Sequence, residues 1–154
     1  MGYVYRPARP EDAIILFEIR RCSILELAPQ GMSAAEATAW AMHLTLAGME
    51  RKLREFDVWV VDLDGVAAGW GAICGERLEG LYVAPQFARR GVGAGLLLRL
   101  ERLMRERGVG VVLADASSNA RDFYLRRGYR CVGAQGGDGA WPIAKELRPH
   151  CAFS

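Results

Sequence analysis

Long hydrophobic runs are missing from this chain of 154 residues. No apolar stretch approaches the roughly 18 residues that a membrane-spanning helix needs. The opening residues, MGYVYRPARPEDA, lack the apolar core of a secretory signal peptide. The sequence therefore predicts a cytoplasmic protein that has no membrane partner.

Residue patterns typical of metal sites and disulfide frameworks are missing as well. The histidines are two and far apart, and the cysteines are four without a C-x-x-C pair: His43, His150, Cys22, Cys74, Cys131 and Cys151. We predict no metal site, and we interpret the cysteines as reduced thiols. No histidine lies near Cys74 or Cys131 in the sequence to activate a thiol, so both are assigned to the core rather than to a covalent mechanism.

A strong charge of one sign is also absent, because the formal net charge is only +2. Arginines nevertheless concentrate between residues 89 and 130, where acidic residues are fewer. No interleaving of aromatic and basic residues accompanies them, so we predict no nucleic-acid partner. A small anionic ligand bound near these arginines explains their distribution better than a polyanion that covers the whole surface.

The pattern of apolar residues predicts an α+β protein with a mixed sheet. Asp64-Gly65 is a hairpin turn signal, and Ser33 with Glu36 forms a capping box at the start of a helix. Strands are expected at residues 3–6, 57–62, 66–74, 78–83, 111–114, 129–132 and 141–147, and helices from residue 10, from residue 33, and at 46–55, 91–107 and 119–127. Hairpins come first and helices then alternate with strands, without repeats or a linker. We therefore expect a single domain over residues 1–154.

A glycine-rich turn joins the strand that ends at Val83 to the following helix. Gly91, Gly93 and Gly95 would let a phosphate approach the unpaired N–H groups at the positive end of the helix dipole. Arg89 and Arg90 would add charge there. The spacing matches neither a P-loop nor a dinucleotide fingerprint, and an alternative is a glycine-rich helix start that serves only close packing.

A second motif, SSNARDFYLRRGYR, covers residues 117–130 and places Phe123 and Tyr124 in a short helix that Gly128 ends. Phe123 is explained by core packing. Tyr124 is of more interest, because a phenol can face a cleft and donate a proton.

Together, the two motifs resemble those of the GNAT superfamily of acetyl-CoA-dependent N-acetyltransferases. The matching stretches are V-A-P at 83–85, R-G-V-G-A-G-L-L at 90–97 and N-A-R-D-F-Y-L-R-R-G-Y at 119–129. The resemblance covers nearly the whole chain and implies the GNAT fold, a twisted, mostly antiparallel sheet of about seven strands flanked by about four helices. The chain departs from the family pattern at Ala88, where many members carry Arg or Gln, and at Arg77, where some carry a carboxylate.

The resemblance also implies acetyl-CoA as the acyl donor, bound in a cleft where two strands splay apart. The residues implied to contact it are Leu81, Tyr82, Val83, Ala88, Arg89, Arg90, Gly91, Val92, Gly93, Ala94, Asn119 and Tyr124. The turn at 88–94 would hold the pyrophosphate and the strand at 81–83 the pantetheine arm. For Asn119, capping of the helix that starts there is an equal alternative.

In the implied reaction, Tyr124 is the acid that protonates the leaving thiolate, and Glu79 is the candidate base. A solvated strand carboxylate is the alternative for Glu79. The acceptor is an amine of a small molecule or a protein, with Trp40 and His43 near it or, for Trp40, simply packed. Two readings stay open: an N-acetyltransferase, or a non-catalytic acyl-CoA-binding module. A homodimer, common for this fold, is also left open.

Overall fold

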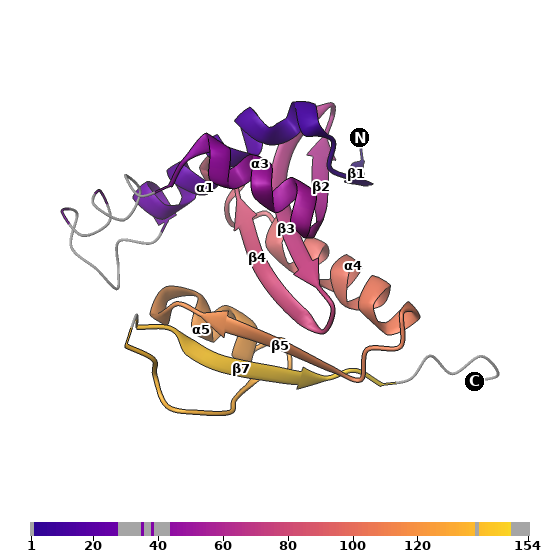
Figure 1. Ribbon diagram of the computed structural model, residues 1–154, viewed down its shortest axis with the longest axis vertical. Coiled ribbons are helices and arrows are strands. Elements are labelled where there is room, and N and C mark those ends of the chain that lie inside the picture. Colours follow the sequence, from indigo (N-terminus) through magenta and orange to yellow (C-terminus); the bar gives the residue numbers. More distant parts are fainter. Residues whose placement is uncertain (1, 28–34, 36–37, 39–43, 138, 149–154) are drawn as a thin grey trace.

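The computed structural model describes residues 2–27, 35, 38, 44–137 and 139–148 (Figure 1). Its sheet has seven strands in the order β1-β2-β3-β4-β5-β7-β6. Their bounds are Tyr3–Pro7 (β1), Asp57–Leu63 (β2), Val66–Cys74 (β3), Arg77–Val83 (β4), Val111–Ala116 (β5), Arg130–Cys131 (β6) and Trp141–Glu146 (β7). All neighbouring strands are antiparallel except β4 and β5. The predicted mixed, mostly antiparallel sheet is therefore confirmed.

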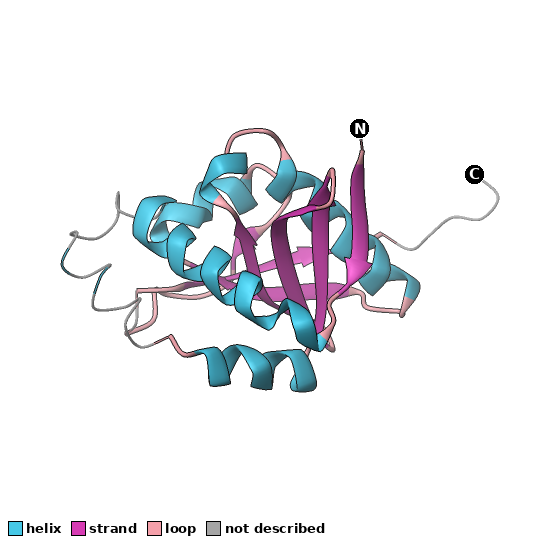
Figure 2. Cartoon of the chain, turned by 90° about the horizontal axis from the view of Figure 1, so that it is seen from above, coloured by secondary structure: helices cyan, strands magenta, loops and turns pink. Residues whose placement is uncertain are grey.

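Helices cover both faces of this sheet (Figures 1 and 2). They are α1 (Ala13–Leu27), α3 (Leu46–Glu55), α4 (Val92–Glu106) and α5 (Ser118–Leu125), with short 3-10 turns η1 (Pro10–Asp12) and η3 (Pro85–Phe87). Neighbouring residues of β2 point to opposite faces, as the strand period of two requires. Val60 packs in the cluster under α1 and α3, and Val61 packs in the cluster under α4.

The strands β4 and β5 pair only at their first residues, where Arg77 lies opposite Leu113 and Leu78 opposite Ala114. The strand β4 then continues to Val83 alongside β3 and diverges from β5 (Figure 1). A β-bulge lies where they part, because Leu78 and Gly80 face consecutive residues of β3 and Glu79 is the extra residue. A bulge bends its strand, so the opening implied by the family resemblance follows from this backbone irregularity.

A partly buried ion-pair cluster and one buried hydrogen bond hold the N-terminal helix on the sheet. Arg6 on β1 donates hydrogen bonds to Asp62 on β2, at 2.7 Å from Nε, and to Asp12 in η1, at 2.8 Å from Nη1. The indole N–H of Trp70 on β3 donates to the carbonyl of Leu16 at 2.9 Å. The start of α1 is thereby fixed over the central strands.

One assignment made from the sequence is wrong, and others concern residues outside the described part of the chain. Cys74 and Cys131 are exposed, so their assignment to the core is wrong; they lie at the end of β3 and on the edge strand β6. The capping box at Ser33, together with Trp40 and His43, lies outside the described residues.

Within the described part of the chain, no helix is both long enough and apolar enough to cross a membrane. The same residues bring together no group of three or more His, Cys, Asp or Glu side chains that could hold a metal ion.

Candidate active site

An open, positively charged turn lies at the end of β4. Arg89 and Gly91 both adopt positive φ, at 64° and 79°, and both are exposed. Gly91 is the N-cap of α4 and has no side chain to cap it. The first-turn N–H groups of Val92, Gly93 and Ala94 consequently find no acceptor among the described residues. A Cβ at Gly91 would meet nothing within 4 Å, so the backbone here is accessible to a ligand.

The other two glycines of the turn have packing roles. A Cβ at Gly93 would lie 3.3 Å from the Val83 side chain and 3.6 Å from the Phe123 ring, so Gly93 lets α4 approach both β4 and α5. A Cβ at Gly95 would lie 2.6 Å from the Tyr5 hydroxyl, so this glycine lets β1 pack against α4. The packing alternative therefore applies to Gly93 and Gly95, and an open anion site fits Gly91.

Tyr124 lies on α5 and is only 7% exposed. Its ring makes edge-to-face contacts with Phe123, at 5.1 Å between centroids, and with Tyr129, at 5.3 Å. Its hydroxyl forms no hydrogen bond with the residues that the structure describes. Burial raises the pKa of this phenol, and the neighbouring Tyr82 raises it further. Tyr124 is therefore protonated at neutral pH and has a proton to donate.

The ring of Tyr129 is held by a buried network that the sequence analysis missed. Its hydroxyl donates to Oε2 of Glu101 at 2.8 Å, and Lys145 on β7 donates to Oε1 at 2.9 Å. Glu101 is 2% exposed, and burial next to this carboxylate raises the pKa of Tyr129. The signal in the sequence is that Glu101 follows Leu97 by four residues, which places a carboxylate on the apolar face of α4. The network thereby holds in place the ring of Tyr129, which packs against the ring of Tyr124.

Glu79, the candidate base, is the bulged residue of β4. Its Oε1 accepts from Nε of Arg77 at 3.3 Å, and Arg77 also donates to Asp115 on β5 at 2.8 Å. Burial and the positive charge of Arg20 lower the pKa of Lys52 on α3, and the negative charge of Glu79 partly offsets this lowering. Glu79 therefore lies toward the α3 side of β4, where it is partly exposed.

The three strand residues implied to bind the donor point to different faces. Leu81 and Val83 pack toward α4, and Tyr82 packs toward α1 with its ring 4.9 Å from that of Trp70. Their backbone lies on the stretch of β4 that has no pairing with β5. At Asn119, the capping interpretation is wrong, because Ser117 is the N-cap of α5 and accepts from the N–H of Ala120 at 3.3 Å.

The chain is similar to known acetyltransferases in sequence and in structure. A family model described as an acetyltransferase (GNAT) domain matches residues 27–140. The uncharacterized N-acetyltransferase YafP of Escherichia coli K12 is 30% identical over 138 residues, which is 88% of either chain. A crystallised GCN5-related N-acetyltransferase from Rhodopseudomonas palustris is 29% identical with a TM-score of 0.86, covering 96% of this chain and 97% of that one. The PaiA N-acetyltransferase of Thermoplasma acidophilum, solved with coenzyme A, is 17% identical with a TM-score of 0.77, covering 96% and 100%.

Proposed function

Because the chain belongs to the GNAT family of acetyltransferases, we propose that it transfers an acetyl group from acetyl-CoA directly to a primary amine of a small molecule or a protein. The observation that carries this proposal is the opening between β4 and β5, with an accessible cationic turn at the end of β4 and the phenol of Tyr124 on α5. We also propose that residues 1–154 form one domain and work in the cytoplasm.

The donor would bind along β4. The N–H groups of residues 92–94 and the side chains of Arg89 and Arg90 suit a diphosphate, since unpaired N–H groups at a helix start and guanidinium groups both favour anions. The edge of residues 81–83 that faces away from β3 has no pairing with β5, so it offers backbone hydrogen bonds to the amide-containing arm, as an added strand would receive. When bound, acetyl-CoA supplies an acetyl group activated as a thioester. Ala88 and Asn119 complete the proposed contacts.

The chain's own residues would move the protons. A primary amine with a pKa near 10.4 is neutral in only about one molecule in 10³ at pH 7. Glu79, directly or through water, would take the amine proton, and its Oε2 is not engaged by Arg77. Tyr124 would donate its proton to the leaving sulfur, because a thiol leaves more easily than a thiolate. A backbone N–H of Tyr82 or Val83 would stabilise negative charge on the carbonyl oxygen.

The test is thiol release from acetyl-CoA by the purified protein, measured with a panel of amines, alongside calorimetry with coenzyme A. Amine-dependent thiol release and an acetylated amine in the mass spectrum are expected. Binding of coenzyme A without amine-dependent release would instead support the non-catalytic acyl-CoA-binding module. Failure to bind coenzyme A at all would contradict both readings.

A further inference from the structure

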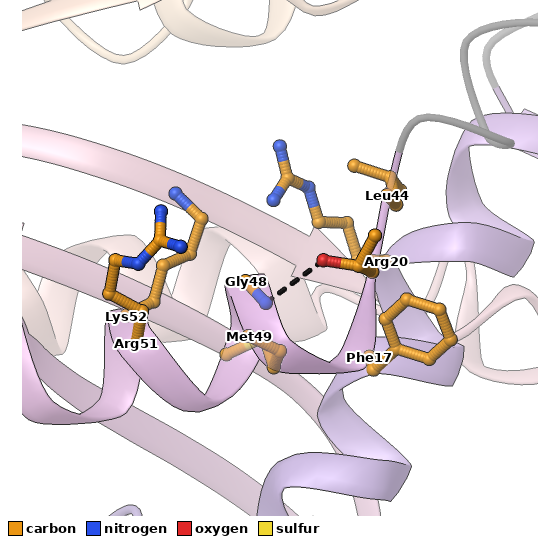
Figure 3. Close-up of a pocket in the computed structure, with 8 residues that line it drawn as sticks. Phe17, Arg20, Leu44, Gly48, Met49, Arg51 and Lys52 are labelled. Carbon is orange, nitrogen blue, oxygen red and sulfur yellow. Dashed lines mark hydrogen bonds between the residues drawn. The ribbon is translucent and has the colours of Figure 1, made fainter.

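A cavity of about 240 Å³ lies between α1 and α3 (Figure 3). These helices cover the face of the sheet opposite α4. We call it the α1–α3 pocket. Phe17 of α1 and Met49 of α3 form its apolar part. The charged ends of Arg20, Arg51 and Lys52 extend to one common side of it.

Positive charge in this pocket is only partly offset by the protein, through the charges of Glu79 and Glu55 acting on Lys52. Of the described residues that line it, three are cations and none is Asp or Glu. Within the described residues, Arg20, Arg51 and Lys52 form no ion pair. The Nε of Arg20 is buried and has no hydrogen-bond partner there, although such donors are usually paired. The arrangement is therefore complementary to an anionic group that the described residues do not supply.

The electrostatics of Lys52 point the same way. Burial lowers its pKa, and the positive charge of Arg20 lowers it further. Two cations held close together at a partly buried site repel each other, and the repulsion is relieved when an anion binds between them. The pocket also includes Thr45 and Gly48, at the N-terminal end of α3, where the helix dipole adds a positive potential.

The pocket adjoins the proposed reaction centre. The guanidinium of Arg20 lies 5.4 Å from the centroid of the Tyr82 ring on β4. Tyr82 is in turn close enough to Tyr124 to raise its pKa. Burial and Arg20 lower the pKa of Lys52, and the charge of Glu79, the proposed base, partly offsets this lowering. An amine that reaches Glu79 would thus have the rest of its molecule next to the pocket.

We propose that the α1–α3 pocket binds an oxyanion, a carboxylate or a phosphate, that is carried by the amine acceptor itself. This inference rests on the proposed function, because it names the substrate class of that reaction. The acceptor is then an amine with an acidic group a few atoms away. Arg20 and Lys52 orient it, and Arg51, which is exposed at the rim, adds attraction.

The donor's own phosphates are a less suitable occupant. The accessible turn for them follows Val83 at the end of β4, whereas the pocket adjoins Glu79 and Tyr82 within the strand. The two sites predict different kinetics. A pocket for the donor would affect the KM for acetyl-CoA, and a pocket for the acceptor would affect the KM for the amine.

The test compares amines in matched pairs that differ only in the acidic group: an α-amino acid with its amide, and phosphoethanolamine with ethanolamine. The wild-type protein should prefer the acidic member of at least one pair by about tenfold or more in kcat/KM, and which pair responds distinguishes carboxylate from phosphate. In Arg51→Gln/Lys52→Gln this selectivity ratio should fall toward one through a higher KM for the acidic amine, with the Kd for coenzyme A unchanged. Arg54→Gln, an exposed charge on α3 outside the pocket, is the matched control and should keep the ratio.

Outcomes against the inference are distinct from those against the proposed function. Turnover of amines without preference for the acidic members, or an equal loss of ratio in Arg54→Gln, overturns the oxyanion pocket and leaves an acetyltransferase. A raised Kd for coenzyme A in the double variant would assign the pocket to the donor. That result would also overturn the inference that the pocket binds the acceptor. Binding of coenzyme A with no turnover of any amine removes both proposals together.

Discussion

Two tyrosines packed against each other provide a sharp test of the mechanism. The rings of Tyr124 and Tyr129 are 5.3 Å apart and almost perpendicular, and both are buried. Only one of them has a hydrogen-bonding partner, since the hydroxyl of Tyr129 donates to Glu101 and that of Tyr124 forms no hydrogen bond with the described residues. Replacing each tyrosine by phenylalanine removes one oxygen atom and keeps the ring packing. Tyr124→Phe should therefore lose catalytic activity, whereas Tyr129→Phe should lose stability.

In Tyr124→Phe, no hydrogen bond within the described residues is lost, so the free energy of unfolding should stay within about 1 kcal/mol of the wild type. If Tyr124 is the proton donor, kcat should fall by about 10²–10⁴-fold, the usual contribution of general acid catalysis. The Kd for coenzyme A should be unchanged. Because burial raises its pKa, the phenol stays protonated as the pH rises toward about 10. The wild-type rate should accordingly rise with pH in that range as the amine deprotonates.

In Tyr129→Phe, Oε2 of Glu101 loses its hydrogen-bond donor, and Glu101 as a residue is only 2% exposed. An unsatisfied buried acceptor costs roughly 1–3 kcal/mol, which corresponds to a fall in Tm of about 2–4 °C per kcal/mol in a protein of this size. The turnover number should change by less than about threefold, or under 1 kcal/mol of activation free energy.

The assays are urea unfolding for stability and thiol release for kcat, performed on both variants and the wild type. A Tyr124→Phe enzyme that is stable, binds coenzyme A and keeps its wild-type kcat would refute the assignment of the acid. So would a Tyr129→Phe enzyme that loses activity as severely while remaining folded, since the proton donor would then be shared or misassigned.

Other predictions concern the supporting structure. Lys145→Met leaves a buried carboxylate without its ammonium partner and should lower the free energy of unfolding by roughly 2–4 kcal/mol in urea titrations. Gly95→Ala places a Cβ 2.6 Å from the hydroxyl of Tyr5 and should cost about 1–3 kcal/mol while the Kd for coenzyme A, measured by calorimetry, stays unchanged. Arg6 lowers the pKa of Asp12, so this pair stabilises the fold above pH about 4 and the stabilisation is lost as the pH falls. In Asp12→Asn, the free energy of unfolding measured between pH 3 and 7 should therefore fall less steeply with decreasing pH than in the wild type.

Local sequence signals predicted the structure correctly where interactions between residues close together in the chain determine it. The Asp64-Gly65 pair predicted the hairpin between β2 and β3, and both residues adopt the required positive φ, at 52° and 82°. The helix predicted at 46–55 has those bounds, and β3 has the bounds predicted at 66–74. The family resemblance then supplied the expectation of a twisted, mostly antiparallel sheet of about seven strands, which the structure confirms.

Contacts between distant segments could not be predicted in this way. The α1–α3 pocket takes its charges from two helices, so Arg20 on α1 and Lys52 on α3 look like ordinary solvated cations in the sequence. The partner of Glu101 is Lys145, 44 residues away. The core assignment of Cys131 was wrong because its strand β6 is at the edge of the sheet, which hydrophobicity alone does not reveal.

The bulge at Glu79 explains why the faces of β4 could not be read from its sequence. Leu78 packs toward α4, and strict alternation from it would point Tyr82 to the same side. The extra residue shifts the pattern by one, and a shift of one residue exchanges the faces of a strand. Tyr82 consequently packs toward α1, beside Arg20, while Leu81 and Val83 pack toward α4. A single inserted residue thus both separates β4 from β5, where the donor is proposed to bind, and turns Tyr82 toward the pocket proposed for the acceptor.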